Sequence, residues 1–217
     1  MKKIKVDLDP EFIYFTADLH YQHKNILTLD GRNQYKDLSE MEEDIRTKLQ
    51  ETLTPESLLI DLGDMFFGTR DNKFQALMSS IPCPIYKILG NHDKEKYFMD
   101  HSDLFLGIYD SFILELNDGT RITLTHYPIL DFPYMYSGGL ELFGHTHGHL
   151  DSFIDSVPYL MLDLGFSAGY SKGTGKFIHK LSDILTYFRN IKMGGFCGGD
   201  FKKWAQEKYH SSESLWR

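Results

Sequence analysis

The sequence predicts an α/β (α+β) fold in which two packed, mixed β-sheets are flanked by helices. Three features of the chain lead to this prediction. The first part alternates strand-like and helix-like segments, and the second part consists mainly of consecutive strand-like segments. In addition, five short polar motifs each follow an apolar run. Because the active residues of βα units lie where a strand ends and its loop begins, these motifs are expected to meet.

The alternating part of the chain holds three predicted strands and two predicted helices. The longer helix is expected to begin at Ser39, whose hydroxyl can cap it, with Glu42 as the partner in a capping box. Met41, Ile45 and Leu49 then recur at helical spacing. In chain order, the segments are residues 12–16 (strand), 39–53 (helix), 57–62 (strand), 74–78 (helix) and 85–89 (strand).

The second part begins with a predicted β-hairpin. Residues 112–116 and 121–125 are strand-like runs, and the turn between them contains Asp-Gly. An Asp-Gly pair between two such runs is the strongest short-range signal for a hairpin. Residues 140–143 and 159–164 supply two further strands, and a final helix is expected to begin at Ser182.

One domain is expected to occupy residues 1–190. A chain of 217 residues can bury enough apolar surface to fold without a disulfide staple. Residues 191–217 form a glycine-rich joint and a C-terminal tail, which is expected to be helical and contains Trp204 and Trp216. The tail is predicted to dock on the domain or on a partner.

The charge and the cysteines limit the classes of partner and the compartment. The net charge is −8, which disfavours an extended surface for nucleic acid. Cys83 and Cys197 lack the spacing of a metal site, and free thiols suit a reducing compartment. No stretch approaches the roughly 18 apolar residues of a membrane span. A cytoplasmic protein without a membrane partner is therefore expected, and its oligomeric state stays open.

The five polar motifs are rich in side chains that bind metal ions. They contain His, Asp and Asn but no Cys, a donor set that suits Mn, Fe, Zn or Ni better than a structural zinc site. Any one motif alone could be a turn or a packed histidine. A buried group of His and Asp without a ligand, however, would cost several kcal/mol in desolvation. The motifs are Asp18-Leu19-His20, Gly63-Asp64, Gly90-Asn91-His92-Asp93, His126 and Gly144-His145-Thr146-His147.

This ordered set of motifs resembles the calcineurin-like metallophosphoesterase superfamily, and the resemblance spans residues 12–185. The run from Asp18 to Ile26 further resembles a compact prokaryotic and phage-type branch of that family. The resemblance implies a four-layer αββα sandwich. The chain departs from the family pattern after Asp64. Many relatives have Asp three residues after the bridging Asp, often followed by Arg, whereas this chain has Phe67 and then Gly68. That departure disfavours a protein serine/threonine phosphatase and favours the small bacterial type.

The resemblance also implies a role for each residue of the motifs. Asp64 would bridge two metal ions, His92 would lie beside the leaving-group oxygen, and Asp93 would orient His92. The other six ligands divide into two groups. The first metal would be held by Asp18, His20 and His147, and the second by Asn91, His126 and His145.

Two divalent ions about 3.5–4 Å apart can clamp both the attacking and the leaving oxygen in the hydrolysis of a phosphoester. Their repulsion is about 18 kcal/mol at an effective dielectric constant of 20, so a shared carboxylate such as Asp64 is needed between them. With the charges of Asp18, Asp64 and a bridging hydroxide, the centre would carry a net +1 and attract an anion. His92 would contribute about 10²–10⁴-fold as a general acid.

Contacts to the substrate are predicted from residues outside the motifs. His23 and Arg32 follow the first motif and are expected to bind a phosphate oxygen, Arg32 in a bidentate manner. A second group of residues is aromatic and lies between two of the metal motifs. These rings could form a packed wall or a stacking platform for a nucleotide base. They are Tyr127, Phe132, Tyr134 and Tyr136.

The predicted function is hydrolysis of a phosphomonoester or phosphodiester bond in a small or nucleotide-like substrate, by direct attack of metal-bound hydroxide. The cofactors would be two divalent ions, with Mn²⁺ favoured over Fe, Zn or Ni. One alternative is a catalytically silent interaction module that kept the fold. Another is a phosphoesterase that processes nucleic acid, which the acidic balance and the lack of a basic stripe disfavour.

Overall fold

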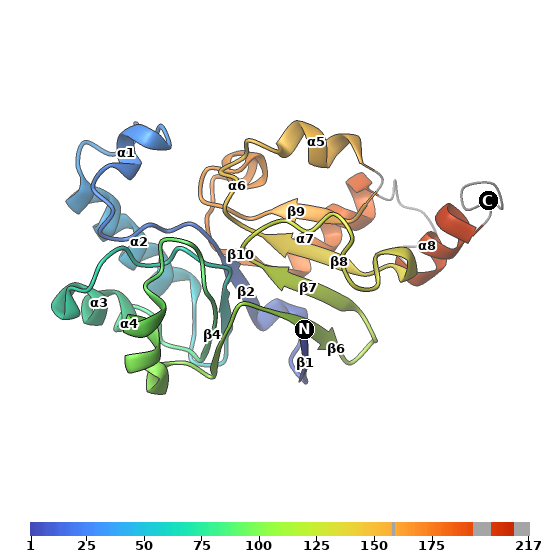
Figure 1. The fold of residues 1–217 in the computed structure, drawn as a ribbon, viewed down its shortest axis with the longest axis horizontal. Coiled ribbons are helices and arrows are strands. Elements are labelled where there is room, and N and C mark those ends of the chain that lie inside the picture. The colour runs from blue at the N-terminus through green and yellow to red at the C-terminus, as the bar shows by residue number, and fades with distance from the viewer. Residues whose placement is uncertain (158, 193–200, 211–217) are drawn as a thin grey trace.

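Two five-stranded sheets form the centre of the computed structural model, which describes residues 1–157, 159–192 and 201–210 (Figure 1). Each sheet is mixed, with one antiparallel pair of strands. The N-terminal sheet has the order β10 (His179–Lys180), β2 (Ile13–Thr16), β3 (Leu58–Asp61), β4 (Ile85–Ile88) and β5 (Gly107–Tyr109). The C-terminal sheet has the order β1 (Lys2–Val6), β6 (Ser111–Leu116), β7 (Arg121–Thr125), β8 (Leu140–Phe143) and β9 (Met161–Asp163).

The main hydrophobic core lies between the two sheets. Phe15 and Ile60 of the N-terminal sheet belong to the same buried cluster as Leu114, Leu124 and Leu142 of the C-terminal sheet. Side chains alternate between the faces of a strand, so the neighbouring residues point to the outer faces. Both faces of the inner strands are covered, which explains why these strands are continuous apolar runs in the sequence.

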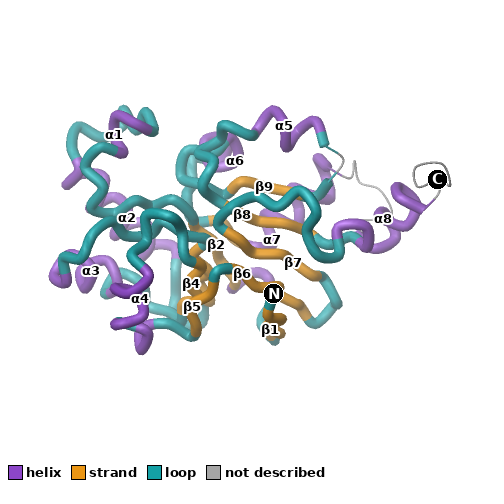
Figure 2. The backbone as a smooth tube through the Cα atoms, in the orientation of Figure 1, coloured by secondary structure: helices purple, strands orange, loops and turns teal. Residues whose placement is uncertain are grey.

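Helices cover both outer faces of the pair of sheets (Figure 2). On the N-terminal sheet, Leu59 packs with Met41 and Ile45 of α2. On the C-terminal sheet, Phe143 packs with Ile154 of α5. The four-layer αββα prediction is therefore confirmed. The helices are α1 (Ile26–Leu29), α2 (Leu38–Thr52), α3 (Asp71–Met78), α4 (Glu95–Asp100), α5 (Asp151–Ser156), α6 (Gly169–Thr174), α7 (Leu181–Tyr187) and α8 (Phe201–His210).

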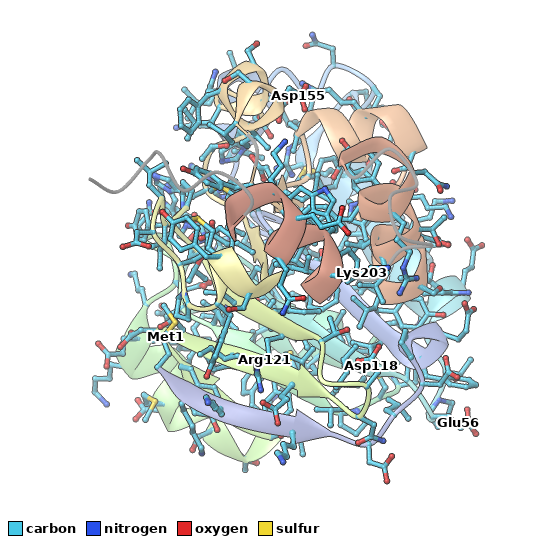
Figure 3. The ribbon with its side chains drawn as sticks, turned by 90° about the vertical axis from the view of Figure 1, so that its right-hand side faces the viewer. Met1, Glu56, Asp118, Arg121, Asp155 and Lys203 are labelled. Atoms are coloured by element: carbon cyan, nitrogen blue, oxygen red, sulfur yellow. The ribbon has the colours of Figure 1, made fainter. Side chains whose placement is uncertain are left out.

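The last two helices contact the core between the sheets. Leu181 and Ile184 of α7 and Trp204 of α8 belong to the inter-sheet cluster. Figure 3 shows α8, which carries the labelled Lys203, beside the C-terminal sheet, whose strand β7 carries the labelled Arg121. Most of the predicted glycine-rich joint, together with Trp216, lies outside the described residues. The division of the chain at residue 190 stays a prediction.

The sequence located the long elements better than the short ones. The hairpin β6–β7 is confirmed, with its predicted turn between them. The N-cap of helix α2, however, lies two residues before the predicted one, because Asp37 rather than Ser39 accepts the hydrogen bond from the N–H of Glu40 in the first turn. The edge strands β1 and β5 and helices α4 to α6 were not predicted. They have three to six residues each, too few for a periodic pattern to show.

No helix in the described part of the chain combines the length and the apolar character that a membrane span requires.

Candidate metal centre

The fold brings the five motifs together at the ends of five strands. β2, β3 and β4 are neighbours in the N-terminal sheet and run parallel. β7 and β8 are parallel neighbours in the C-terminal sheet. Carboxyl ends of parallel strands lie at the same edge of a sheet, so their loops converge. Each of these strands ends one to three residues before the first predicted ligand of its motif. The strand ends and the ligands that follow them are Thr16 and Asp18, Asp61 and Asp64, Ile88 and Asn91, Thr125 and His126, and Phe143 and His145.

Most of the predicted ligands have an unusual backbone conformation. Five of the seven have a positive φ, between 50° and 70°: Asp18, His20, Asp64, His145 and His147. Residues other than glycine rarely adopt this left-handed region, and each costs on the order of 1–3 kcal/mol. Such strain persists where the surrounding structure holds it, and here it turns ligand side chains toward the common centre. The sequence carried no direct signal for this strain.

The first group of predicted ligands forms one compact cluster. Ligand atoms of Asp18, His20 and His147 all lie within 4.8 Å of one another. The Nε2 atoms of His20 and His147 are 3.3 Å apart. The Oδ2 atom of Asp64 lies 3.7 Å from Nε2 of His20. These four residues are therefore placed as the resemblance implied for the first metal.

The second group meets on the other side of Asp64. Oδ1 of Asn91 lies 3.0 Å from Nε2 of His126 and 2.9 Å from Nδ1 of His145. Oδ2 of Asp64 lies 3.4 Å from Nε2 of His126. The same carboxylate oxygen therefore faces both groups, which is the position required of a bridging ligand.

The chemistry of these atoms fits cations. Nδ1 of His126 lies 3.0 Å from the carbonyl oxygen of Leu62, so this nitrogen carries the proton and donates it. In the neutral ring, Nε2 of His126 is then the acceptor that a cation requires, and it faces the oxygen atoms of Asn91 and Asp64. Burial lowers the pKa of His20 to about 2, so His20 is also a neutral donor of a lone pair. Converging lone pairs repel one another unless a cation lies between them.

Asp18 supports the same conclusion. Burial, followed by the negative charges of Asp163 and Asp64, raises the pKa of Asp18 well above its ordinary value. Its carboxylate accepts the backbone N–H of His145 at 2.9 Å. A divalent ion among these groups would offset both burial and repulsion. The residues present therefore fit a divalent cation, and the division of the ligands between two ions stays a prediction.

Two glycines allow the motifs to approach this closely. A Cβ atom at Gly90 would lie within 3.0 Å of the Asp64 carboxylate, and one at Gly63 within 3.0 Å of the His126 ring. Gly63 also has a φ of 114°. Any larger residue at either position would displace a ligand.

Arg32 does not contact the substrate side of the site, and its predicted phosphate contact is wrong. The side chain is buried, with 1% of the residue exposed. Its guanidinium donates to the carbonyl oxygen of Asp18 at 2.7 Å and to that of Leu19 at 3.0 Å. It also stacks on the ring of Phe166, 3.9 Å from the centroid. Arg32 therefore fixes the backbone of the first ligand loop from behind.

Asp30, which supports His147, was not among the residues predicted from the sequence. Oδ1 of Asp30 lies 3.1 Å from Nδ1 of His147, although the contact is not as straight as a good hydrogen bond. Its other oxygen accepts from Nε of Arg32 at 2.8 Å and from Oγ of Ser167 at 2.6 Å. Burial acts to raise the pKa of Asp30, but these partners outweigh it and hold the pKa at about 2. In sequence, Asp30 precedes glycine and resembles an ordinary turn residue.

The predicted orientation of His92 by Asp93 is also wrong. The Asp93 carboxylate accepts the backbone N–H groups of Asp64 at 2.8 Å and Gly90 at 2.9 Å. It also pairs with the buried ammonium group of Lys87, which pairs with Asp61 as well. Burial acts to lower the pKa of Lys87, yet the two carboxylates raise it. Asp93 therefore ties the Asp64 loop to the Asn91 loop.

The carboxylate of Asp163 holds the loop that carries His145 and His147. Asp163, at the end of β9, accepts from the hydroxyl of Thr146 and from the N–H groups of Gly148 at 3.2 Å and Gly165 at 2.7 Å. Burial raises the pKa of Asp163, and these three hydrogen bonds act against that rise. Asp163 was not among the predicted residues, because no spacing in the sequence relates it to the histidines.

His92 and His23 both lie beside the first group of ligands. The His92 ring is 5.1 Å from the His20 ring, and its backbone N–H donates to Oδ1 of Asp64 at 2.8 Å. His23 lies behind His20, with their Nδ1 atoms 3.2 Å apart. Phe67 stacks on His23 with ring centroids 4.3 Å apart. The catalytic role of His92 and the substrate contact of His23 stay predictions.

The predicted aromatic cluster is divided by the structure. Tyr127 lies beside the second group of ligands, with its ring 4.4 Å from that of His145 and 51% of the residue exposed. Phe132 is buried in the core under α5. Tyr134 carries the guanidinium of Arg121 on its ring. A wall role fits Phe132, whereas Tyr127 is placed for contact with a ligand.

The chain is similar to known proteins in sequence and in fold. The family described as calcineurin-like phosphoesterase matches residues 13–160 of the chain. A crystal structure of AQ665 from Aquifex aeolicus, a protein of unknown function, is similar, with a TM-score of 0.62 and 27% sequence identity. The similarity covers 80% of this chain and 98% of that one. No curated protein matches the sequence significantly.

Proposed function

Because the chain belongs to the calcineurin-like phosphoesterase family, we propose that it hydrolyses phosphoester bonds with two divalent metal ions. The observation that carries this proposal is the position of Asp64. One oxygen of its carboxylate faces Nε2 of His20 at 3.7 Å and Nε2 of His126 at 3.4 Å. A carboxylate shared in this way is what two neighbouring cations require. The proposed substrate is a small or nucleotide-like phosphomonoester or phosphodiester.

When bound, the two ions would position the phosphate oxygens and lower the pKa of a coordinated water from 15.7 to about 7. The protein contributes the arrangement around them. Asp64 balances charge between the two groups of ligands, and Arg32 and Asp93 fix the loops that carry them. His92, beside His20, is proposed to give a proton to the leaving-group oxygen.

Manganese is the proposed native metal. The donors are imidazole nitrogens and carboxylate or amide oxygens, without a thiolate, which suits Mn²⁺ and leaves Fe, Zn and Ni as alternatives. The proposed partner is a small phosphoester or nucleotide in the cytoplasm. The net charge of −8 supports a small anion over a nucleic-acid backbone.

The test combines metal analysis with a panel of aryl phosphomonoesters and phosphodiesters. Protein stripped with a chelator and reloaded with Mn²⁺ is expected to hold two metal equivalents and to hydrolyse at least one class of ester. Chelation should abolish the activity and Mn²⁺ should restore it. Protein that binds both ions but hydrolyses no ester would instead support the catalytically silent module.

A further inference from the structure

Two partly exposed aromatic rings flank the ligand cluster, one beside each group. Phe67, 39% exposed, stacks on His23, and its ring is 5.8 Å from that of His92. Tyr127, 51% exposed, lies 4.4 Å from the ring of His145. Phe67 therefore belongs to the side of the proposed general acid, and Tyr127 to the side of the second metal. Exposed aromatic rings next to a catalytic centre are surfaces on which the organic part of a substrate can pack.

The charge around the cluster limits which phosphoester fits. Among the described residues, no lysine or arginine pairs with the side-chain atoms that face the metals. The two nearest buried cations, Arg32 and Lys87, are engaged with carboxylates and backbone carbonyls behind the ligands. With Asp18, Asp64 and one hydroxide, two divalent ions leave a net charge of +1. That value matches the single negative charge of a phosphodiester better than the two charges of a phosphomonoester.

We propose that the substrate is a phosphodiester with a planar aromatic group on each side of phosphorus. This inference rests on the proposed phosphoesterase function. The leaving group packs on Phe67, and the group that stays on phosphorus packs on Tyr127. The attacking water releases a proton to solvent as its oxygen bonds to phosphorus. The phosphorus–oxygen bond to the leaving group breaks, and that oxygen takes a proton from His92, which regains one from solvent. The products are a phosphomonoester and an alcohol or phenol.

The test uses three esters with the same 4-nitrophenol leaving group. Bis(4-nitrophenyl) phosphate has an aromatic retained group, methyl 4-nitrophenyl phosphate has a small one, and 4-nitrophenyl phosphate has none. The Mn²⁺-loaded protein is expected to show at least about 10-fold higher kcat/KM for the bis-aryl diester than for the monoester. Only the retained group differs between the two diesters, so their comparison isolates the contact with Tyr127.

Three variants separate the two rings. Tyr127→Ala should lower kcat/KM for the bis-aryl diester by about 5- to 100-fold, the loss of one stacking contact, and lower that of the methyl diester far less. Tyr127→Phe, which keeps the ring, should restore most of the loss. Phe67→Ala should lower kcat/KM for both diesters by similar factors, because both substrates lose the same contact with the leaving group. Phe153→Ala, which removes a 41%-exposed ring from α5, is the matched control and should change neither.

A preference for the monoester would overturn the inference and leave the phosphoesterase proposal intact. Equal losses on both diesters in Tyr127→Ala would also overturn it. Failure to hydrolyse any of the three esters would contradict the phosphoesterase proposal itself. Calorimetry gives an independent readout, because diphenyl phosphate should bind the Mn²⁺-loaded protein more tightly than phenyl phosphate. The reverse order of affinity would contradict the inference whatever the rates.

Discussion

The two halves of the metal centre are built differently. In the first half, Asp18 and His20 are buried, and side chains behind them brace the ligands: Arg32 binds the Asp18 loop, and Asp30 reaches His147. In the second half, His126 is also buried, but Asn91 is exposed; His145 is half-buried, as is His147 of the first half. The contacts that support these ligands mainly involve backbone groups. The carbonyl oxygen of Leu62 accepts from His126, and the carboxylate of Asp93 accepts the N–H of Gly90.

From these contacts we expect the first half to be the more rigid one before metal binds and the second half to be more open to water. Outer contacts that orient ligands typically change metal affinity by about 10- to 100-fold. We therefore expect the first metal to be held more tightly. Asp64 is the residue that both halves share, so its replacement should weaken metal binding in both halves. Replacement of a residue that supports only one half should weaken metal binding in that half alone.

The largest effect is expected from Asp64→Asn. This change removes the negative charge that lies between the two cations, so the protein should lose at least one metal equivalent. Turnover should fall by about 10³-fold or more, which corresponds to several kcal/mol of transition-state stabilisation. Metal analysis and ester hydrolysis measure the two effects. A variant with normal metal content and rate would show that Asp64 is not the bridge.

Lys87→Met should have the largest effect on folding. Lys87 is fully buried between the carboxylates of Asp61 and Asp93, and the variant leaves two buried charges without their cation. Breaking a buried pair typically costs about 3–5 kcal/mol in the free energy of unfolding. Urea denaturation measures this loss. Lys96→Met, which removes an exposed pair with Asp100, is the control and should cost less than about 1 kcal/mol.

Asp30→Asn should weaken the first metal alone. The amide cannot replace the negative charge beside Nδ1 of His147, so affinity at the first site should fall by about 10- to 100-fold. Titration of chelator-stripped protein with Mn²⁺ should show two separated binding steps in the wild type and a smaller separation in the variant. Asp71→Asn, which removes the negative charge beside the hydroxyl of Tyr97 but keeps an oxygen that can accept from it, is the control. Equal weakening of both steps would argue against separate braces.

The sequence indicated the proposed ligands but not the residues that support them, and the reason is physical. Ligands stand at strand ends, where an apolar run and a polar motif are adjacent in sequence, so the pattern shows directly. Asp30, Lys87 and Asp163 act across long separations that only the packed fold creates. Arg32 was assigned to the substrate because arginine often binds phosphate, and burial could not be read from its sequence neighbours.

The elements of the fold were also predicted only where a local sequence pattern shows them. Long runs with a clear period, such as α2 and the β6–β7 hairpin, were located to within about two residues. The short edge strand β1 was missed because only Ile4 and Val6 alternate with its exposed lysines, a run too short to show a period. The third position after Asp64, where many relatives have aspartate, holds Phe67, and only the structure shows that this ring stacks on His23.

The effect of Glu141→Gln is expected to depend on pH, and it tests the support of the second half. Glu141 is buried on β8, and Oε1 accepts from the N–H of Ile129, three residues after the ligand His126. Burial raises the pKa of Glu141 to about 8, against an ordinary value of 4.5. Between these values the folded protein keeps the proton and the unfolded chain has lost it. The free energy of unfolding should therefore fall as pH rises, by about 1.4 kcal/mol per pH unit from this group.

Glutamine cannot ionise, so Glu141→Gln should remove this part of the pH dependence. Urea denaturation of metal-free protein at pH 5, 6, 7 and 8 gives the comparison, and the other titrating groups cancel in the difference between the two proteins. The variant should gain stability relative to the wild type as pH rises toward 8. A constant difference across that range would mean that Glu141 ionises alike in the folded and unfolded states, and that the loop after His126 rests on an ordinary carboxylate.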